Sequence, residues 1–117
     1  MKNSPLRDRS FELAVSIVHL CRRISREKSE YVITRQLLKS GTNPGAMTRE
    51  AQNAESIKDF IHKLRIALKE AEETQYWLDL LLETDLMSRR EHEKIYGLCN
   101  EVTKMLTSSI ITAQKRL

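Results

Sequence analysis

One stretch of the sequence, residues 57–83, constrains the fold more than any other. It reads IKDFIHKLRIALKEAEETQYWLDLLLE and contains neither Gly nor Pro. One row of positions recurs at intervals of four and three residues, which places their side chains on one face of an α-helix. This row is Ile57, Ile61, Leu64, Leu68, Ala71, Gln75, Leu78 and Leu82. A parallel row runs beside it, so the stripe is broad enough to face more than one neighbouring helix. We predict one long helix here, packed against partners of similar length.

The composition of the whole chain favours further helices around this one. Only three Gly and two Pro occur in 117 residues, too few for the many turns of an all-β fold. The good helix formers Leu, Glu, Lys, Arg and Ala are frequent throughout. A chain of this length is one domain by the usual size range. We therefore expect residues 1–117 to form a single all-α domain.

Capping residues and apolar spacing together place four helices. Ser4 followed by Pro5 is typical of a helix start, although a start near Ser10 fits the pattern as well. Ser56 and Ser88 each precede an acidic residue by three positions, as in a capping box. Residues 1–3 are expected to be frayed. The predicted helices span about 5–26, 30–54, 57–84 and 88–115.

The second predicted helix contains residues that usually end helices. Its segment SGTNPGA, residues 40–46, includes Gly41, Pro44 and Gly45. Pro44 removes one backbone hydrogen bond and crowds the carbonyl four residues before it. Two outcomes are open, one kinked helix or two shorter helices around a turn. Because the four-three spacing continues through the segment, the pattern favours one helix kinked near Gly41–Gly45.

Short connections between long helices predict an up-down-up-down antiparallel four-helix bundle. In that topology the end of the first helix and the start of the fourth lie at the same end. Six cations would gather there: Arg22, Arg23, Arg26, Lys28, Arg89 and Arg90. Lys115 and Arg116 would lie at the opposite end. The six cations either complement the helix dipole or contact phosphate groups, and the sequence leaves both interpretations open.

Charge and hydropathy limit the compartment and the partners. The net charge is +4, a mild excess that is compatible with nucleic-acid binding but not diagnostic of it. No apolar run approaches the length of a membrane span, and the first ten residues lack the apolar core of a signal peptide. We expect a cytoplasmic protein without a membrane role. Cys21 and Cys99 fall on apolar helix faces and are interpreted as reduced packing residues.

The sequence carries no recognisable catalytic or metal-binding motif. Asp59 and His62 are spaced for one side of a metal site, but no second pair completes it. No Cys-x-x-Cys or His-Glu-x-x-His motif occurs, and neither cysteine has neighbours that would lower its pKa. We predict no enzymatic activity, no cofactor and no metal. An enzyme without a known motif stays open as a third alternative.

Two adjacent aromatic residues, Tyr76 and Trp77, lie beside the core row of the long helix. At least one of them must therefore point away from the main packing face. A large aromatic side chain at such a margin often anchors a protein interface. The alternative is that both belong to the core at one end of the bundle. We predict that they form a subunit interface.

Three segments resemble a known family. They are SFELAVSIVHL at 10–20, QLLKSGT at 36–42 and DFIHKLRIALKEAEETQYWLDLL at 59–81. Together they resemble the four-helix bundle proteins named for the 23S rRNA intervening sequence. The resemblance implies an up-down bundle that assembles as a ring-shaped homopentamer and has no catalytic residues. That family is similar to the accessory protein of diversity-generating retroelements, a basic pentameric barrel that binds nucleic acid and a reverse transcriptase.

Residues and resemblance together predict one function and leave one alternative. The predicted function is a non-enzymatic, pentameric scaffold that binds structured RNA or DNA through its basic end. Its expected partners are further copies of the chain, RNA or DNA, and a protein that processes nucleic acid. Five copies would raise the net charge from +4 to about +20, which strengthens phosphate binding. The alternative is a protein–protein interaction module with no nucleic-acid role.

Overall fold

Four helices make up the structure, a computed structural model that describes residues 4–117. They are α1 (Pro5–Lys28), α2 (Val32–Ala51), α3 (Ile57–Glu83) and α4 (Arg89–Gln114). Residues 4–117 contain no β-strand. The predicted all-α four-helix bundle is confirmed. The fraying expected for Met1–Asn3 lies outside the described residues.

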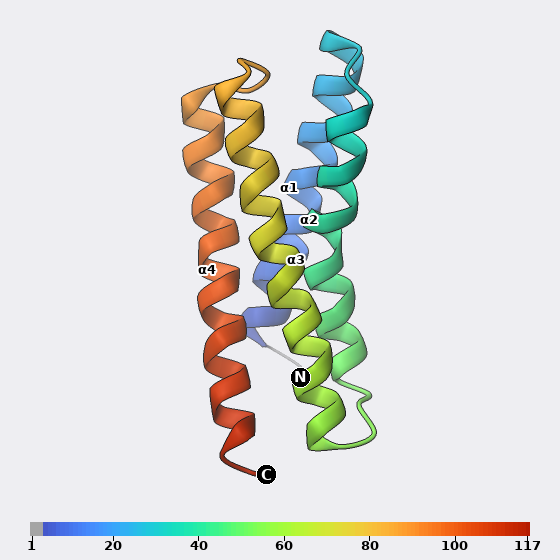
Figure 1. The fold of residues 1–117 in the computed structure, drawn as a ribbon, viewed down its shortest axis with the longest axis vertical. Helices are drawn as coiled ribbons and strands as arrows, with labels where there is room; N and C mark the ends of the chain where they lie inside the picture. Colours follow the sequence, from blue (N-terminus) through green and yellow to red (C-terminus); the bar gives the residue numbers. More distant parts are fainter. Residues whose placement is uncertain (1–3) are drawn as a thin grey trace.

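The helices lie side by side in a bundle that measures 47 × 22 × 20 Å (Figure 1). Each helix packs against its neighbour in the chain, and α1 also contacts α4, although less extensively. The α1–α2 and α3–α4 connections lie at one end, and the α2–α3 connection lies at the other end with the C-terminus (Figure 1). The end of α1 and the start of α4 therefore share one end of the bundle.

Serine side chains begin three of the four helices. Ser4, Ser56 and Ser88 each accept a hydrogen bond from the backbone N–H three residues later, at 3.0–3.2 Å. At the start of α4 the Glu91 carboxylate returns the interaction by accepting from the Ser88 N–H at 3.1 Å. These bonds satisfy N–H groups that have no partner inside the helix, which explains why the helices begin where they do.

The start of α2 is capped by a glutamate side chain and not by a serine. The Glu30 carboxylate accepts from the N–H groups of Val32, Ile33 and Thr34 at 2.9–3.0 Å. Burial opposes ionisation of this carboxyl, but those hydrogen bonds outweigh it and hold its pKa below the ordinary value. Because the carboxylate occupies the N–H groups at the start of α2, the helix begins at Val32, two residues later than predicted. It ends at Ala51, three residues earlier than predicted.

The α2 helix continues without a break through Pro44, which is buried inside it. Of the two outcomes open from the sequence, the structure therefore has one helix, and the predicted kink stays a prediction.

Two glycines on this helix allow close approach of α1. A Cβ atom on Gly41 would lie 2.7 Å from Cγ1 of Ile17, and one on Gly45 would lie 3.2 Å from the Ser10 carbonyl oxygen. A side chain at Gly41 would therefore clash with Ile17, and one at Gly45 would crowd the backbone of α1.

Small and polar side chains dominate the buried face of α2, where Leu37 and Ala51 are the buried apolar side chains apart from Pro44. Ser40 and Thr74 are both fully buried, and their hydroxyl oxygens lie 3.0 Å apart across the α2–α3 contact. Each hydroxyl also lies near a carbonyl of its own helix. Both hydroxyls of the pair are therefore satisfied within the core, as most buried polar groups are.

Large aliphatic side chains from the other three helices supply most of the core. The buried aliphatic residues of α1, α3 and α4 are Leu6, Leu13, Ile17, Leu20, Ile24, Ile61, Leu64, Leu78, Leu81, Ile95, Val102, Leu106 and Ile110. Many of them are three or four residues apart, as in the sequence pattern, whereas Ile57 of the predicted core row is 37% exposed. Within residues 4–117, no helix combines enough length with enough apolar character to cross a membrane.

Candidate nucleic-acid interface

The six cations predicted to contact phosphate come from two elements. Arg22, Arg23, Arg26 and Lys28 lie on the last two turns of α1, and Arg89 and Arg90 open α4. Figure 1 shows the end of α1 and the start of α4 at the same end of the bundle. We call these six residues the basic end. Lys115 and Arg116 lie at the C-terminus of the chain, at the other end (Figure 1).

Arg23 differs from the other five residues because its guanidinium group is already bound. Its Nη2 atom donates to both carboxylate oxygens of Glu91, at 2.9 and 2.7 Å, and its Nη1 atom donates to Glu27 at 3.1 Å. Glu91 also caps α4 through the Ser88 N–H. Arg23 thus ties the end of α1 to the start of α4, and it is the weakest phosphate-binding candidate of the six.

The remaining five members of the basic end are exposed side chains. None of them forms an ion pair with a carboxylate anywhere in the described part of the chain. These residues are Arg22, Arg26, Lys28, Arg89 and Arg90. Exposed cations without an intramolecular partner retain their charge for an external anion, and arginine fits phosphate through two parallel hydrogen bonds.

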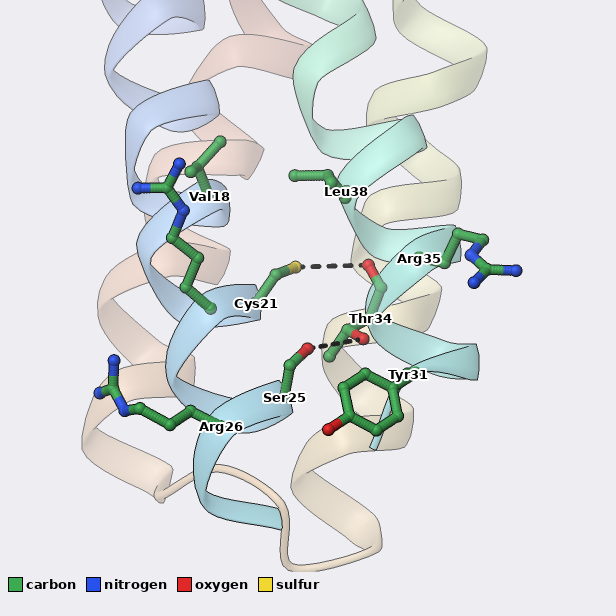
Figure 2. A pocket seen from close by; sticks show the side chains of 9 residues that line it. Val18, Cys21, Ser25, Arg26, Tyr31, Thr34, Arg35 and Leu38 are labelled. Atoms are coloured by element: carbon green, nitrogen blue, oxygen red, sulfur yellow. Dashed lines mark hydrogen bonds between the residues drawn. The ribbon is translucent and has the colours of Figure 1, made fainter. Parts of the chain in front are cut away.

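Arg22 and Arg26 border a groove between α1 and α2, with a volume of about 790 Å³. We call it the α1/α2 groove. Its lining residues are Val18, Cys21, Arg22, Ser25, Arg26, Tyr31, Thr34, Arg35 and Leu38. Figure 2 shows side chains from both helices around it. Two of these residues were not predicted from the sequence: Arg35 on α2 and Tyr31, which precedes the first residue of α2.

Two hydrogen bonds join the helices at the floor of the groove (Figure 2). The Cys21 thiol donates to the Thr34 carbonyl oxygen at 3.4 Å, and the Ser25 hydroxyl donates to the Thr34 hydroxyl oxygen at 3.2 Å. The Thr34 hydroxyl donates in turn to the Glu30 carbonyl oxygen at 3.0 Å. The polar atoms of the floor are therefore engaged with one another, and the charged atoms lie at the rim.

Neither cysteine has the properties of a nucleophile. Burial raises the pKa of the Cys21 thiol to about 12, with a further contribution from the Glu30 charge. Burial likewise raises the pKa of the Cys99 thiol to about 12, and this thiol donates to the Ala71 carbonyl oxygen. Both side chains are free and buried. At neutral pH both are protonated, whereas nucleophilic attack requires the thiolate.

The histidines do not converge on a metal site. His92 contacts Asp79 at 2.8 Å through Nε2, and its ring stacks on Tyr96. His19 and His62 are exposed. Among residues 4–117, no three His, Cys, Asp or Glu side chains come together in a way that could hold a metal ion.

The two aromatic residues predicted to form an interface lie in different surroundings. Tyr76 is 59% exposed on α3. Trp77 is half-buried against the core, and its indole N–H donates to Glu73 at 3.1 Å. The two rings meet edge to face, with centroids 4.9 Å apart. Trp77 therefore contacts Tyr76 from the core side, and Tyr76 leaves an aromatic surface exposed on the outside of the bundle.

The chain is similar to a described protein family and to a solved structure. A family model described as 23S rRNA-intervening sequence protein matches residues 2–108. A crystal structure of a protein with unknown function, from the S23 ribosomal protein family of Bacteroides thetaiotaomicron VPI-5482, shares 48% sequence identity and a TM-score of 0.89. That similarity covers 90% of this chain and 97% of the other. No match is found among curated proteins.

Proposed function

The chain belongs to the family of 23S rRNA-intervening sequence proteins, and we propose that it is a non-enzymatic oligomeric scaffold that binds structured RNA or DNA through its basic end. The observation that carries this proposal is the set of five exposed cations at one end of the bundle, none of them paired with a carboxylate among residues 4–117. Arg23, in contrast, already binds Glu91 and Glu27.

Assembly would multiply the electrostatic attraction. We propose a ring of five copies, the state that the family resemblance implies, with Tyr76 in the contact between subunits. A ring requires two different surfaces on each copy that fit one another. Five copies at +4 each carry about +20, and phosphate binding that releases many counterions weakens steeply as salt rises. The support for an interface is the exposed Tyr76 ring, held in place by Trp77.

Charge reversal at the basic end tests the proposal. In the variant Arg22→Glu/Arg26→Glu, affinity for a fluorescently labelled RNA hairpin should fall about 100-fold at moderate salt, because two phosphate contacts become repulsive. The matched control is Arg65→Glu/Lys69→Glu, which reverses two exposed cations with the same four-residue spacing on α3. Fluorescence anisotropy measures both variants. Equal losses in the two variants would show that only net charge matters and would overturn the choice of surface.

Light scattering after gel filtration tests the ring. Five chains of 13.6 kDa give a mass near 68 kDa. The variant Tyr76→Ala should lower that mass, because it removes the apolar anchor of the contact. A mass of one chain for the unaltered protein would exclude the ring.

The exposed Tyr76 ring also favours a second candidate function, a protein–protein interaction module with no nucleic-acid role. In that case the basic end only keeps the assembly in solution. The two functions differ in one result. If the unaltered protein assembles but binds neither RNA nor DNA at low salt, the interaction module is the better account.

A further inference from the structure

The α1/α2 groove combines an exposed aromatic ring with three arginines. Tyr31 lies just before the first residue of α2 and is 57% exposed. Figure 2 shows this ring at the mouth of the groove, below Leu38 and opposite Ser25. Tyr31 precedes Val32, the first residue of α2, so the hydrogen bonds that Glu30 makes to the start of the helix also fix its backbone.

The three arginines of the groove hold no internal partner. Arg22 and Arg26 lie one turn apart on α1, and Arg35 lies one turn after Tyr31 on α2. Figure 2 shows the side chains of Arg26 and Arg35 extending to opposite sides of the groove. Across the part of the chain that the structure describes, none of the three pairs with a carboxylate, whereas Arg9 and Arg23 on α1 both do.

We propose that the α1/α2 groove binds a nucleotide that is not base-paired, within a single-stranded segment of RNA or DNA. The base stacks on the Tyr31 ring, and the flanking phosphates are bound by Arg22, Arg26 and Arg35. This inference rests on the proposed function and specifies which part of the nucleic acid the chain would bind. Stacking on aromatic rings together with arginine–phosphate contacts is how proteins hold single strands.

The groove has the physical properties that such a ligand requires. Val18 and Leu38 supply apolar surface beside the ring, and the volume of about 790 Å³ accommodates a base with its sugar. Base identity should matter little, because Thr34, Ser25 and Cys21 use their polar groups on one another. Stacking and charge, unlike hydrogen bonds to base edges, tolerate any sequence.

A second copy of the chain is the competing occupant of the groove. A subunit that covered it would have to bury three guanidinium groups, which is unfavourable unless the incoming surface supplies a carboxylate for each. A nucleic-acid strand brings one negative charge per nucleotide and needs no such coincidence. The charge of the groove rim therefore favours the nucleic acid.

Binding of matched oligonucleotides tests the inference. A labelled single-stranded oligouridylate and an RNA duplex of the same length are titrated with the 117-residue protein, and fluorescence anisotropy gives each affinity. We expect Tyr31→Ala to weaken single-strand binding by about 10-fold or more, and duplex binding by less than about 2-fold. Tyr31→Phe should restore the loss, since it keeps the ring. Arg35→Ala should lower the salt dependence, by about 0.7 in the logarithmic slope.

Matched controls separate the groove from general effects. Phe11→Ala removes the ring of a different exposed aromatic residue, which lies on α1 and is 52% exposed, and Arg65→Ala removes an exposed arginine of α3. Both variants should bind the single strand normally. If Tyr31→Ala binds as these controls do while Arg22→Glu/Arg26→Glu loses affinity, the inference is overturned and the proposed function stands. If the unaltered protein binds no nucleic acid, the proposed function fails first. A lower native mass for Tyr31→Ala would assign the groove to a contact between copies and also overturn the inference.

Discussion

The two contacts that α1 makes with its neighbouring helices differ in whether their arginines are paired with carboxylates. Along the α1/α4 contact, Arg23 binds Glu91 and Arg9 binds Glu101 at 3.3 Å, so arginines hold the helices together. Along the α1/α2 contact, glycines on α2 allow the helices to lie close together, and a serine and a cysteine of α1 donate hydrogen bonds to α2. The neighbouring Arg22 has no carboxylate partner among the described residues. The number of cations on a surface therefore does not give the number of charges available to an external anion, because some of them are paired with carboxylates.

The largest expected effect concerns the close α1/α2 approach. Gly41→Ala places a Cβ atom 2.7 Å from Cγ1 of Ile17, a fully buried β-branched side chain that cannot easily move aside. We expect the free energy of unfolding to fall by about 2 to 3 kcal/mol, measured by urea denaturation. Gly97→Ala is the matched control, since nothing lies within 4 Å of its added Cβ. It should raise stability by up to about 1 kcal/mol, because Gly is a poor helix former. A loss in both variants would contradict the role given to this contact.

Charge reversal at Arg22 and Arg23 tests whether an unpaired and a paired arginine have different roles. Arg23→Glu would place a carboxylate beside Glu91 and Glu27, and we expect unfolding free energy to fall by about 2 kcal/mol. Arg22→Glu should leave stability within about 0.5 kcal/mol and lower affinity for RNA about 10-fold. Thermal denaturation and anisotropy on both proteins measure these effects. Similar behaviour of the two variants would remove the distinction between paired and unpaired arginines.

The Glu30 carboxylate that caps α2 should make the stability of the fold depend on pH. Glu30→Ala should lower stability by about 1 kcal/mol at neutral pH. Because hydrogen bonds hold the pKa of Glu30 in the folded protein below its ordinary value of 4.5, the ionised carboxylate stabilises the fold above pH 4.5. That contribution is lost as pH falls through the folded-state pKa. The difference in melting temperature between Glu30→Ala and the unaltered protein should therefore narrow in acid, and a constant difference would argue against the cap.

The smallest expected effect is a gain of affinity. Glu91→Gln keeps a side chain that can cap α4 but removes the charge that neutralises Arg23. Affinity for RNA should rise about 3-fold, equivalent to about 0.6 kcal/mol. Glu93→Gln on the same turn is the control, because it changes net charge equally without releasing an arginine. An equal gain in both variants would mean that Arg23 adds nothing when freed.

Local patterns in the sequence were sufficient to predict the helices. Apolar spacing and the caps at Ser4, Ser56 and Ser88 located three helix starts to within a residue. The start of α2 was placed wrongly, because its cap comes from Glu30, a residue type that rarely takes this role. Pro44 left two outcomes open, since a single missing backbone bond does not decide whether packing holds the helix together.

The candidate site was harder to predict than the helices. The basic end follows from helix order, but the pairing of Arg23 with Glu91 joins residues far apart in the sequence. The α1/α2 groove depends on how two helices are rotated against each other, which no local pattern specifies. Arg35 and Tyr31 were missed for that reason.

The buried hydroxyl pair Ser40–Thr74 has a consequence for helix alignment. Because the buried face of α2 is nearly smooth, with few bulky ridges, apolar packing alone would allow α2 to slide along α3 by a turn. Such a slide would separate the two hydroxyls and leave each with only the carbonyl of its own helix, whereas the native register joins them at 3.0 Å. The hydrogen bond between the two hydroxyls therefore favours one register of α2 against α3. Because Tyr31 precedes α2 and Tyr76 lies on α3, the same register sets the position of one tyrosine relative to the other.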